Sequence, residues 1–271
     1  MNGSVLLPGN LFNGKDTEMY QFFVEPQQIH MDDKSVIITG SDVNHIKNVL
    51  RMKIGEELAV SNGIDGKEYR CGIREYTEDA VLCELRFIKE DGVELPSRIY
   101  LFQGLPKADK MELIIQKAVE LGVYEVIPVA MKRCVVRLDE KKAASKITRW
   151  QGIAEAAAKQ SKRGIIPKIT EVMTFSQALE YSKQAQVRLV PYELAEGMDR
   201  TREIIDGIRP GQDIAVFIGP EGGFDEDEIR KAIEDGMQSV TLGKRILRTE
   251  TAGMTVLSIL MYHLEISAVQ V

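Results

Sequence analysis

The sequence predicts an α/β protein of two domains, a small β-rich domain followed by a larger domain built on a parallel sheet. A chain of 271 residues is long for one small domain and comfortable for two. Up to about residue 90, short apolar runs alternate with turn residues, which is typical of antiparallel strands. Beyond that point, apolar runs alternate with amphipathic segments, which is typical of a parallel sheet covered on both faces. We therefore expect domains at residues 19–91 and 92–271.

The first eighteen residues, MNGSVLLPGNLFNGKDTE, lack the basic start and apolar segment of a secretion signal. A more regular pattern begins at Met19. We expect residues 1–18 to be a disordered upstream extension.

The β-rich part contains the runs FFV, SVIITG, EELAVSNGIDGKEYRCGI and AVLCELRFI, each bounded by Gly, Asp or Asn. These runs predict a small β-barrel. The one helical candidate is segment 42–50. It places four apolar side chains on one face: Val43, Ile46, Val49 and Leu50.

The larger domain begins with a strand at RIYLFQ, residues 98–103. Asp109 is expected to cap the next helix with Glu112 three residues on, and Gly122 to end it. Further strands are expected at VIPVA, VRLVPYE, DIAVFIG and SVTLG. Helices are expected near residues 141–162, 175–182, 225–235 and 251–266.

Composition excludes several classes of protein. Hydrophobic residues make up 44% and charged residues 28%, which is ordinary for a soluble protein, and no apolar run approaches the roughly 18 residues of a membrane span. The three cysteines are far apart with no CxxC pair, and the three histidines are scattered. We therefore expect no disulfide framework, no metal site and a cytoplasmic location.

Two loops have unusual compositions. IGPEGGF, residues 218–224, follows an apolar strand and precedes a helix that Asp225 and Glu228 are expected to cap. LGKRILRTETA, residues 242–252, follows the strand SVTLG, and LVPYE ends a third strand. Because ligands collect at the carboxyl ends of parallel strands, these three segments predict one cleft.

The glycines of these loops could equally be ordinary turn residues, and Arg245 and Arg248 solvated charges. Neither GxGxxG nor GxxxxGKS/T occurs, so a phosphate cradle is not indicated, and Glu221 would repel a polyphosphate. A cleft of backbone groups, apolar side chains and a carboxylate suits an amphipathic ligand with an adenine-like ring and a positive centre.

The two loops closely resemble those of the ribosomal RNA small subunit methyltransferase E family, in the SPOUT superfamily. GLPKADKMELIIQKAVELGVYEVIPV, RWQGIAEAAAKQSKRGIIPKI and HIKNVLRMKIGEEL are also similar to that family, so the resemblance runs from about Met19 to the C-terminus. It implies a SPOUT-type trefoil-knotted parallel sheet domain with an N-terminal PUA-like β-barrel, assembled as a homodimer. The implied reaction transfers a methyl group from S-adenosylmethionine to N3 of a uridine in 16S ribosomal RNA of the 30S subunit.

The resemblance also implies site residues, and no metal. The expected cofactor-binding residues are Val190, Pro191, Tyr192, Glu193, Ile218, Gly219, Pro220, Glu221, Gly222, Leu242, Gly243, Ile246, Leu247 and Arg248. Arg248 is expected to stabilise the uridinate that forms when N3 loses its proton. Glu221 and Glu250 are candidate bases or orienting groups, although Glu250 could instead pair with Arg248 or cap the last helix.

RNA binding has mixed support from charge. The net charge is −6, and residues 19–90 contain nine basic and thirteen acidic residues. Residues 132–168, in contrast, contain eleven Lys or Arg and three acids, a local charge of +8. This segment could be an RNA footprint or simply a solvated helix face. The expected RNA contacts are Arg51, Arg133, Gln160 and Arg163.

Two other functions remain open. A non-enzymatic RNA-binding protein would have the basic segment and no cofactor cleft, whereas another transferase or nucleotide enzyme on this scaffold would ignore ribosomal RNA. The last helix is expected to contribute to the dimer through Met254, Leu257, Leu260, Met261 and Leu264, although core packing would give the same spacing.

Overall fold

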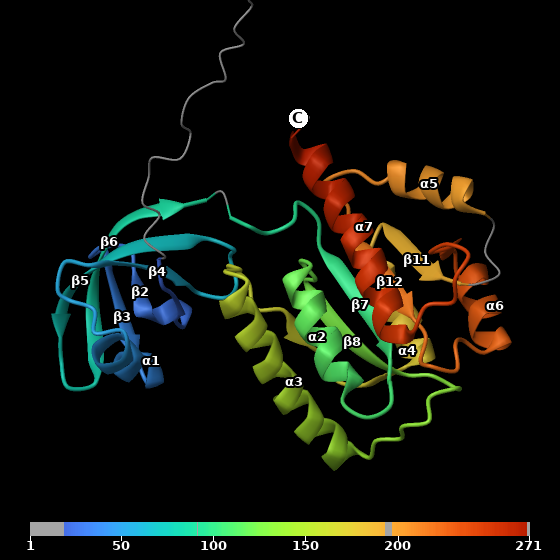
Figure 1. Ribbon diagram of the computed structural model, residues 1–271, viewed down its shortest axis with the longest axis horizontal. Helices are drawn as coiled ribbons and strands as arrows, with labels where there is room; N and C mark the ends of the chain where they lie inside the picture. The colour runs from blue at the N-terminus through green and yellow to red at the C-terminus, as the bar shows by residue number, and fades with distance from the viewer. Residues whose placement is uncertain (1–18, 91, 193–196, 270–271) are drawn as a thin grey trace, which may run out of the picture. The chain divides into compact units, whose positions relative to one another are not determined.

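The computed structural model describes residues 19–90, 92–192 and 197–269, which form two compact units (Figure 1). The first unit contains residues 19–60 and 69–88. The second contains residues 61–68 together with the chain from residue 89 onward. Segment 61–68 thus belongs to the larger unit although it lies within the predicted β-rich domain. The predicted extension, residues 1–18, lies outside the described residues.

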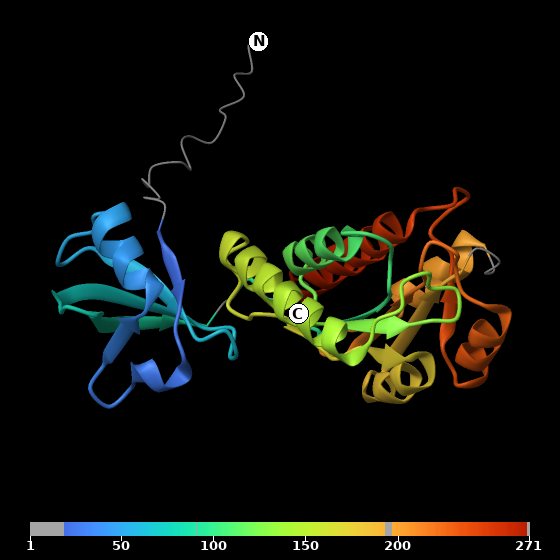
Figure 2. The ribbon, with the colours of Figure 1, turned by 90° about the horizontal axis from the view of Figure 1, so that it is seen from below.

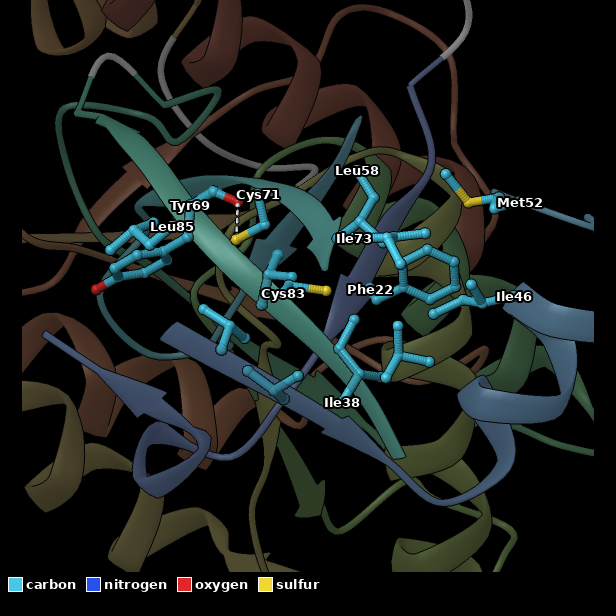
Figure 3. Packing of buried hydrophobic residues seen from close by; sticks show 14 of the residues in the cluster. Phe22, Ile38, Ile46, Met52, Leu58, Tyr69, Cys71, Ile73, Cys83 and Leu85 are labelled. Carbon is cyan, nitrogen blue, oxygen red and sulfur yellow. Dashed lines mark hydrogen bonds between the residues drawn. The ribbon is translucent and has the colours of Figure 1, made fainter. Parts of the chain in front are cut away.

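The first unit is built on a six-stranded sheet in the order β1-β4-β5-β6-β3-β2. Its strands are β1 (Gln21–Phe23), β2 (Ile29–His30), β3 (Ser35–Thr39), β4 (Glu57–Ser61), β5 (Glu68–Tyr76) and β6 (Ala80–Lys89). A 3-10 turn, η1 (Pro26–Gln28), precedes β2. β3 runs antiparallel to β2 and β6, and β4 runs antiparallel to β5. Alternate side chains of these strands form one apolar core, which includes Phe22, Ile38, Leu58 and Ile73 (Figure 3).

The predicted helix over residues 42–50 forms in two parts, α1 (Ser41–Asn44) and a π-helical turn, η2 (His45–Val49). Val43 and Ile46 are buried as expected, but Val49 is 61% exposed, so its predicted burial is wrong. The Leu50 amide donates to the His45 carbonyl, five residues back. A π-turn has more residues than an α-turn, which rotates Val49 away from the core.

The second unit contains a parallel sheet in the order β10-β8-β7-β12-β11-β13, with β9 also paired to β8. Its strands are β7 (Ile99–Gly104), β8 (Glu125–Ala130), β9 (Lys168–Ile169), β10 (Met173–Thr174), β11 (Val187–Pro191), β12 (Ile214–Ile218) and β13 (Gln238–Val240). These strands pair in parallel. The predicted parallel sheet is confirmed.

The helices of this unit are α2 (Lys110–Glu120), α3 (Glu140–Gln160), α4 (Phe175–Tyr181), α5 (Met198–Asp206), α6 (Glu226–Glu234) and α7 (Thr249–Val269), and a 3-10 turn, η3 (Ser182–Gln184), follows α4. Five of these helices match predicted segments or follow a predicted start. The exception is α5, whose sequence MDRTREIID is mostly polar and buries only Thr201, Ile204 and Ile205. These three residues lie at helical spacing, so the periodicity was present in the sequence, but the segment is short and mostly polar and was not predicted as a helix.

The central strands β7 and β12 are buried along their whole lengths. Phe102 of β7 stacks on Phe217 of β12 with ring centroids 4.3 Å apart. Phe175 and Tyr181 of α4 pack edge-on against this pair. α4 therefore covers one face of the sheet, while α2 and α7 lie together on the other (Figure 2).

Two of the predicted helix boundaries are confirmed and one cap is wrong. Asp225 and Glu228 form the expected capping box at α6, and Gly122 follows α2 in the left-handed conformation with φ +86°. Asp109 makes no side-chain cap, because it has φ −93° and ψ 12° instead of the extended backbone that a capping residue needs.

Two glycine substitutions should change stability in opposite directions. Gly122→Ala should destabilise the protein by about 2 kcal/mol, because its backbone is left-handed and the new Cβ would lie 2.6 Å from Leu95 Cδ1. Gly152→Ala, inside α3 with nothing within 4 Å of the new Cβ, should stabilise by about 1 kcal/mol. Urea unfolding of the wild type and both variants measures these changes in the free energy of unfolding. Equal stabilities would contradict the assignment of Gly122 as a helix stop.

Candidate active site

A cavity of about 1110 Å³ lies at the carboxyl ends of β11, β12 and β13. Most of its lining comes from three segments at the ends of those strands: residues 191–192, the loop 218–224 and the segment 241–249. Because the strands are parallel, their ends meet at one edge of the sheet, which is where α/β folds bind ligands. The predicted convergence of the three loops is confirmed.

The loop 218–224 is a tight turn that depends on its glycines. The Gly223 amide donates to the Pro220 carbonyl at 2.9 Å, and Gly223 has φ +68°. A Cβ on Gly219 would lie 3.2 Å from the Gly223 carbonyl carbon. The turn therefore exposes backbone groups to the cavity at positions where larger residues would not fit.

A buried hydrogen-bond chain joins this loop to β7 and α7. Gln103, fully buried at the end of β7, donates from Nε2 to Thr249 Oγ1 at 2.9 Å. Thr249 Oγ1 in turn donates to the Gly219 carbonyl at 2.6 Å. This chain fixes the start of α7 against the glycine loop. A glutamine inside the apolar run RIYLFQG was the sequence signal for it, because a buried polar side chain needs a partner.

Charged groups gather at the cavity edge. Lys110, the first residue of α2, lies 3.2 Å from carboxylate oxygens of both Glu221 and Glu250. Burial acts to raise the pKa of Glu221, but the hydrogen bond from the Lys107 amide and the Lys110 ammonium outweigh it and hold that pKa below its usual value. Contacts with Glu250 and Glu221 raise the pKa of Lys110. Lys110 and Glu221 are therefore both ionised at neutral pH.

The arrangement has the chemistry of a site for an amphipathic organic ligand. Backbone groups of the glycine loop, the apolar side chains of Phe224, Leu242 and Leu247, and the exposed Arg248 all line the same space. Within the described ranges, no three His, Cys, Asp or Glu side chains cluster as a metal site would require. No helix in that same part of the chain is long and apolar enough to span a bilayer.

Comparison with known proteins identifies the family. The profile described as the RNA methyltransferase domain matches residues 93–261, and the RNA methyltransferase PUA domain matches residues 38–86. Ribosomal RNA small subunit methyltransferase E of Bacillus subtilis (strain 168) is 36% identical over 252 residues, covering 92% of this chain and 98% of that protein. The chain belongs to the ribosomal RNA small subunit methyltransferase E family.

Solved structures of similar methyltransferases have the same fold as this chain. One from Legionella pneumophila, in complex with S-adenosylmethionine, has a TM-score of 0.74 and 30% identity, covering 90% of this chain and 97% of that one. Ribosomal RNA small subunit methyltransferase E from Neisseria gonorrhoeae, bound to S-adenosylmethionine, has a TM-score of 0.73 with the same identity and coverage. The predicted fold class, a SPOUT-type α/β domain with a separate PUA-like unit, is confirmed.

Most of the cofactor-binding residues predicted for this family member lie together. Twelve line the cavity: Pro191, Tyr192, Ile218, Gly219, Pro220, Glu221, Gly222, Leu242, Gly243, Ile246, Leu247 and Arg248. Val190 is buried within β11 and is not among the lining residues, and Glu193 lies outside the described residues. Lys110, which also lines the cavity, was not predicted from the sequence, because its partners come from distant parts of the chain.

The predicted RNA contacts are scattered through this methyltransferase. Arg133 lines the cavity, and its guanidinium donates to the Gly222 carbonyl at 3.3 Å. Gln160 is exposed at the end of α3. Arg51, in the first unit, is exposed and left-handed, with φ +54°. Their contact with RNA stays a prediction.

Arg163 is not a surface residue, so its predicted contact with an RNA phosphate is wrong. Its side chain is 5% exposed and pairs with Glu94. Its guanidinium also donates to the carbonyls of Val119 and Val123, at 3.1 and 2.6 Å. Glu94 in turn accepts from the amides of Gly164 and Ile165. Arg163 therefore joins three segments of the second unit. In the sequence it lies in a run of basic residues, a pattern that does not show that its side chain is buried.

The apolar stripe on α7 is largely core. Leu257, Leu260 and Leu264 are at most 1% exposed within the single chain, whereas Met254 and Met261 are half-buried. Packing inside this unit therefore accounts for the first three, as the alternative interpretation expected.

Arg163→Met should destabilise the protein by about 3 kcal/mol, because it leaves the Glu94 carboxylate without its buried partner. Lys141→Met, which removes an exposed charge at the start of α3, is the matched control and should change stability by less than about 0.5 kcal/mol. Thermal and urea unfolding measure both. If the Arg163 variant is as stable as the wild type and binds RNA more weakly, the predicted contact between Arg163 and an RNA phosphate would be supported after all.

Proposed function

We propose that this protein transfers a methyl group from S-adenosylmethionine to N3 of a uridine in 16S ribosomal RNA of the small subunit. The observation that carries the proposal is the cavity that the loops 218–224 and 241–249 form together, in a chain of this family. Relatives with 30% identity over 90% of the chain have S-adenosylmethionine bound. The protein thus belongs, by this proposal, among the RNA-modifying enzymes of the cytoplasm.

The residues present fit this cofactor. A cavity of about 1110 Å³ is large enough for a nucleoside with an amino-acid chain. The backbone groups of residues 218–223 are suited to hydrogen bonds with polar edges, and Leu242 and Leu247 to packing against an adenine ring. When bound, the cofactor supplies an activated methyl group on its sulfonium. The protein has to hold this group in line with the acceptor.

Arg248 is the proposed catalytic residue. Uridine N3 becomes a good nucleophile only when it loses its proton, and the resulting negative charge spreads over the neighbouring oxygens. A guanidinium stabilises such charge in the transition state. Arg248 is exposed and lines the cavity directly before α7. Ala252 donates its amide to the Arg248 carbonyl, which fixes the backbone from which the guanidinium extends.

Glu221 and Glu250 are better suited to orientation than to proton removal. Glu221 has a lowered pKa and is bound by the Lys107 amide and Lys110, which makes it a weak base for a uracil N–H. Glu250 pairs with Lys110 and lies in the first turn of α7, where a negative charge also stabilises the helix.

RNA binding is proposed for exposed basic and polar residues of both units. Arg133 adjoins the cavity, and Gln160 lies on the exposed surface of α3. Arg51 would contribute from the PUA-like unit. Since the chain carries a net charge of −6, contacts from such local groups have to outweigh the overall repulsion.

The trefoil knot and the homodimer are also proposals. The knot is supported by the resemblance and by the fixed path of the chain near residues 240–249. There the Thr241 amide donates to Thr201 Oγ1, and Thr249 binds Gln103 and Gly219. For the dimer, α7 carries exposed apolar side chains, Tyr262 at 68% and Ile266 at 43%.

The reaction is tested with 30S subunits from a strain that lacks this modification. Labelled S-adenosylmethionine and wild-type protein should yield 3-methyluridine, while 30S subunits from the parent strain accept no label.

Arg248→Ala should slow transfer about a hundredfold and leave cofactor binding nearly unchanged. Gly222→Val should mainly weaken cofactor binding, because Gly222 lines the cavity and a branched side chain there would occupy space beside the backbone that the cofactor approaches. RNA binding without cofactor binding would favour a non-enzymatic protein, and unlabelled RNA would favour another transferase.

The dimer predicts a sedimentation coefficient of two chains at micromolar concentration. Tyr262→Glu should shift the population toward monomer, since a charge is costly in a buried interface. Arg202→Glu, at an exposed position of α5, is the control and should leave assembly unchanged. A monomeric wild-type protein would remove the proposal.

A further inference from the structure

Lys110 is the shared partner of two carboxylates that come from different segments of the active site. Its Nζ lies 3.2 Å from Glu221 Oε1, in the glycine loop, and 3.2 Å from Glu250 Oε2, in the first turn of α7. The three side chains are 15–30% exposed, so solvent screens them only in part. One ammonium thus joins α2, the glycine loop and α7.

The two carboxylates depend on Lys110 to different degrees. Glu221 Oε1 also accepts from the Lys107 amide at 3.0 Å. Glu250 Oε2 is buried and has no hydrogen-bond partner among the described residues, so the ion pair at 3.2 Å is its compensation. Because both oxygens contact one Nζ, the carboxylates lie close enough to repel each other when that charge is removed.

The same contacts set the geometry of the cavity. Glu221 lies among the loop residues that line it, and Glu250 is two residues beyond Arg248. Holding both carboxylates therefore holds the glycine loop at a set distance from the segment that presents Arg248. Other charged groups on the cavity walls are Arg133, Glu226, and the Lys244 and Arg245 pair of the segment 241–249. No ion pair between these groups and Glu221 or Glu250 occurs in the described part of the chain.

We propose that Lys110 is a positioning residue of the cofactor site, which locks the glycine loop to the start of α7 and cancels the repulsion between Glu221 and Glu250. This inference rests on the proposed function, because the cavity it shapes is the one assigned to S-adenosylmethionine. Lys110 acts on the cofactor through the two segments that it joins.

Removal of Lys110 should create a pH dependence that the wild type lacks. Without the ammonium, one of two neighbouring carboxylates has its pKa raised by the other. As pH falls, that carboxylate binds a proton and the repulsion disappears. The loss of affinity for S-adenosylmethionine caused by the substitution is therefore greatest at high pH and smallest at low pH.

The test is calorimetric titration of S-adenosylmethionine into wild-type protein and variants from pH 6 to pH 8.5. The ratio of variant to wild-type dissociation constants cancels titration of the ligand itself. For Lys110→Met this ratio should be about tenfold at pH 8.5, the size of one charge-assisted contact, and should fall as pH is lowered. Lys110→Arg, which keeps the charge, should stay within about threefold at every pH.

Two further variants keep the test decisive. Lys141→Met removes an equal charge from an exposed side chain at the start of α3, outside the cavity lining, and should match the wild type. Lys110→Met with Glu250→Gln removes both members of one pair, so its ratio should no longer depend on pH. Circular dichroism checks that each variant is folded.

The outcomes separate the two proposals. A wild-type protein that binds no S-adenosylmethionine overturns the proposed function. A wild type that binds it, with Lys110→Met showing wild-type affinity or a ratio that does not change with pH, overturns the role of Lys110. If Lys110→Met does not fold, a pH-dependent ratio in the double variant overturns it as well.

Discussion

The pairing of β7 with β12 is the constraint on which the active site depends. These strands are more than a hundred residues apart in the chain, yet they run in parallel from Ile99 beside Ile214 to Gln103 beside Ile218. Stacking of Phe102 on Phe217 adds a side-chain contact to the backbone ladder. Because β12 ends at Ile218, the pairing delivers the glycine loop to the edge where β7 ends, and Gln103 can then reach Thr249 at the start of α7.

Charges in the second unit fall into two groups with different consequences. The Arg163 guanidinium is buried and pairs with the half-buried Glu94, so this ion pair connects segments and affects stability. The groups around the cavity are partly exposed, and there a single ammonium, Lys110, offsets two carboxylates. The proposed catalytic guanidinium, Arg248, can remain available for developing negative charge because Lys110 takes the pairing role. The cavity edge therefore holds two carboxylates paired with Lys110 while Arg248 forms no ion pair with either of them in the described residues.

The first unit shows how a local change in helix geometry alters a surface. The π-turn η2 leaves Val43 and Ile46 in the core and turns Val49 outward beside the left-handed Arg51. Helical periodicity assumes 3.6 residues per turn, so one wider turn shifts every later position. The unit is acidic overall, and such local features have to supply whatever RNA contacts it makes.

By itself, the sequence determined the parallel sheet and the location of the cavity, because apolar runs, the Asp225 capping box and the glycine loop are local features with local physical causes. It also supplied the family through segments spread along the chain. Only the tertiary structure decided which charges are buried and which meet: Arg163 and Glu94 are 69 residues apart, and Lys110 is over a hundred residues from its partners. Burial and pairing depend on which segments fold against one another, and the composition of one segment carries no record of its neighbours.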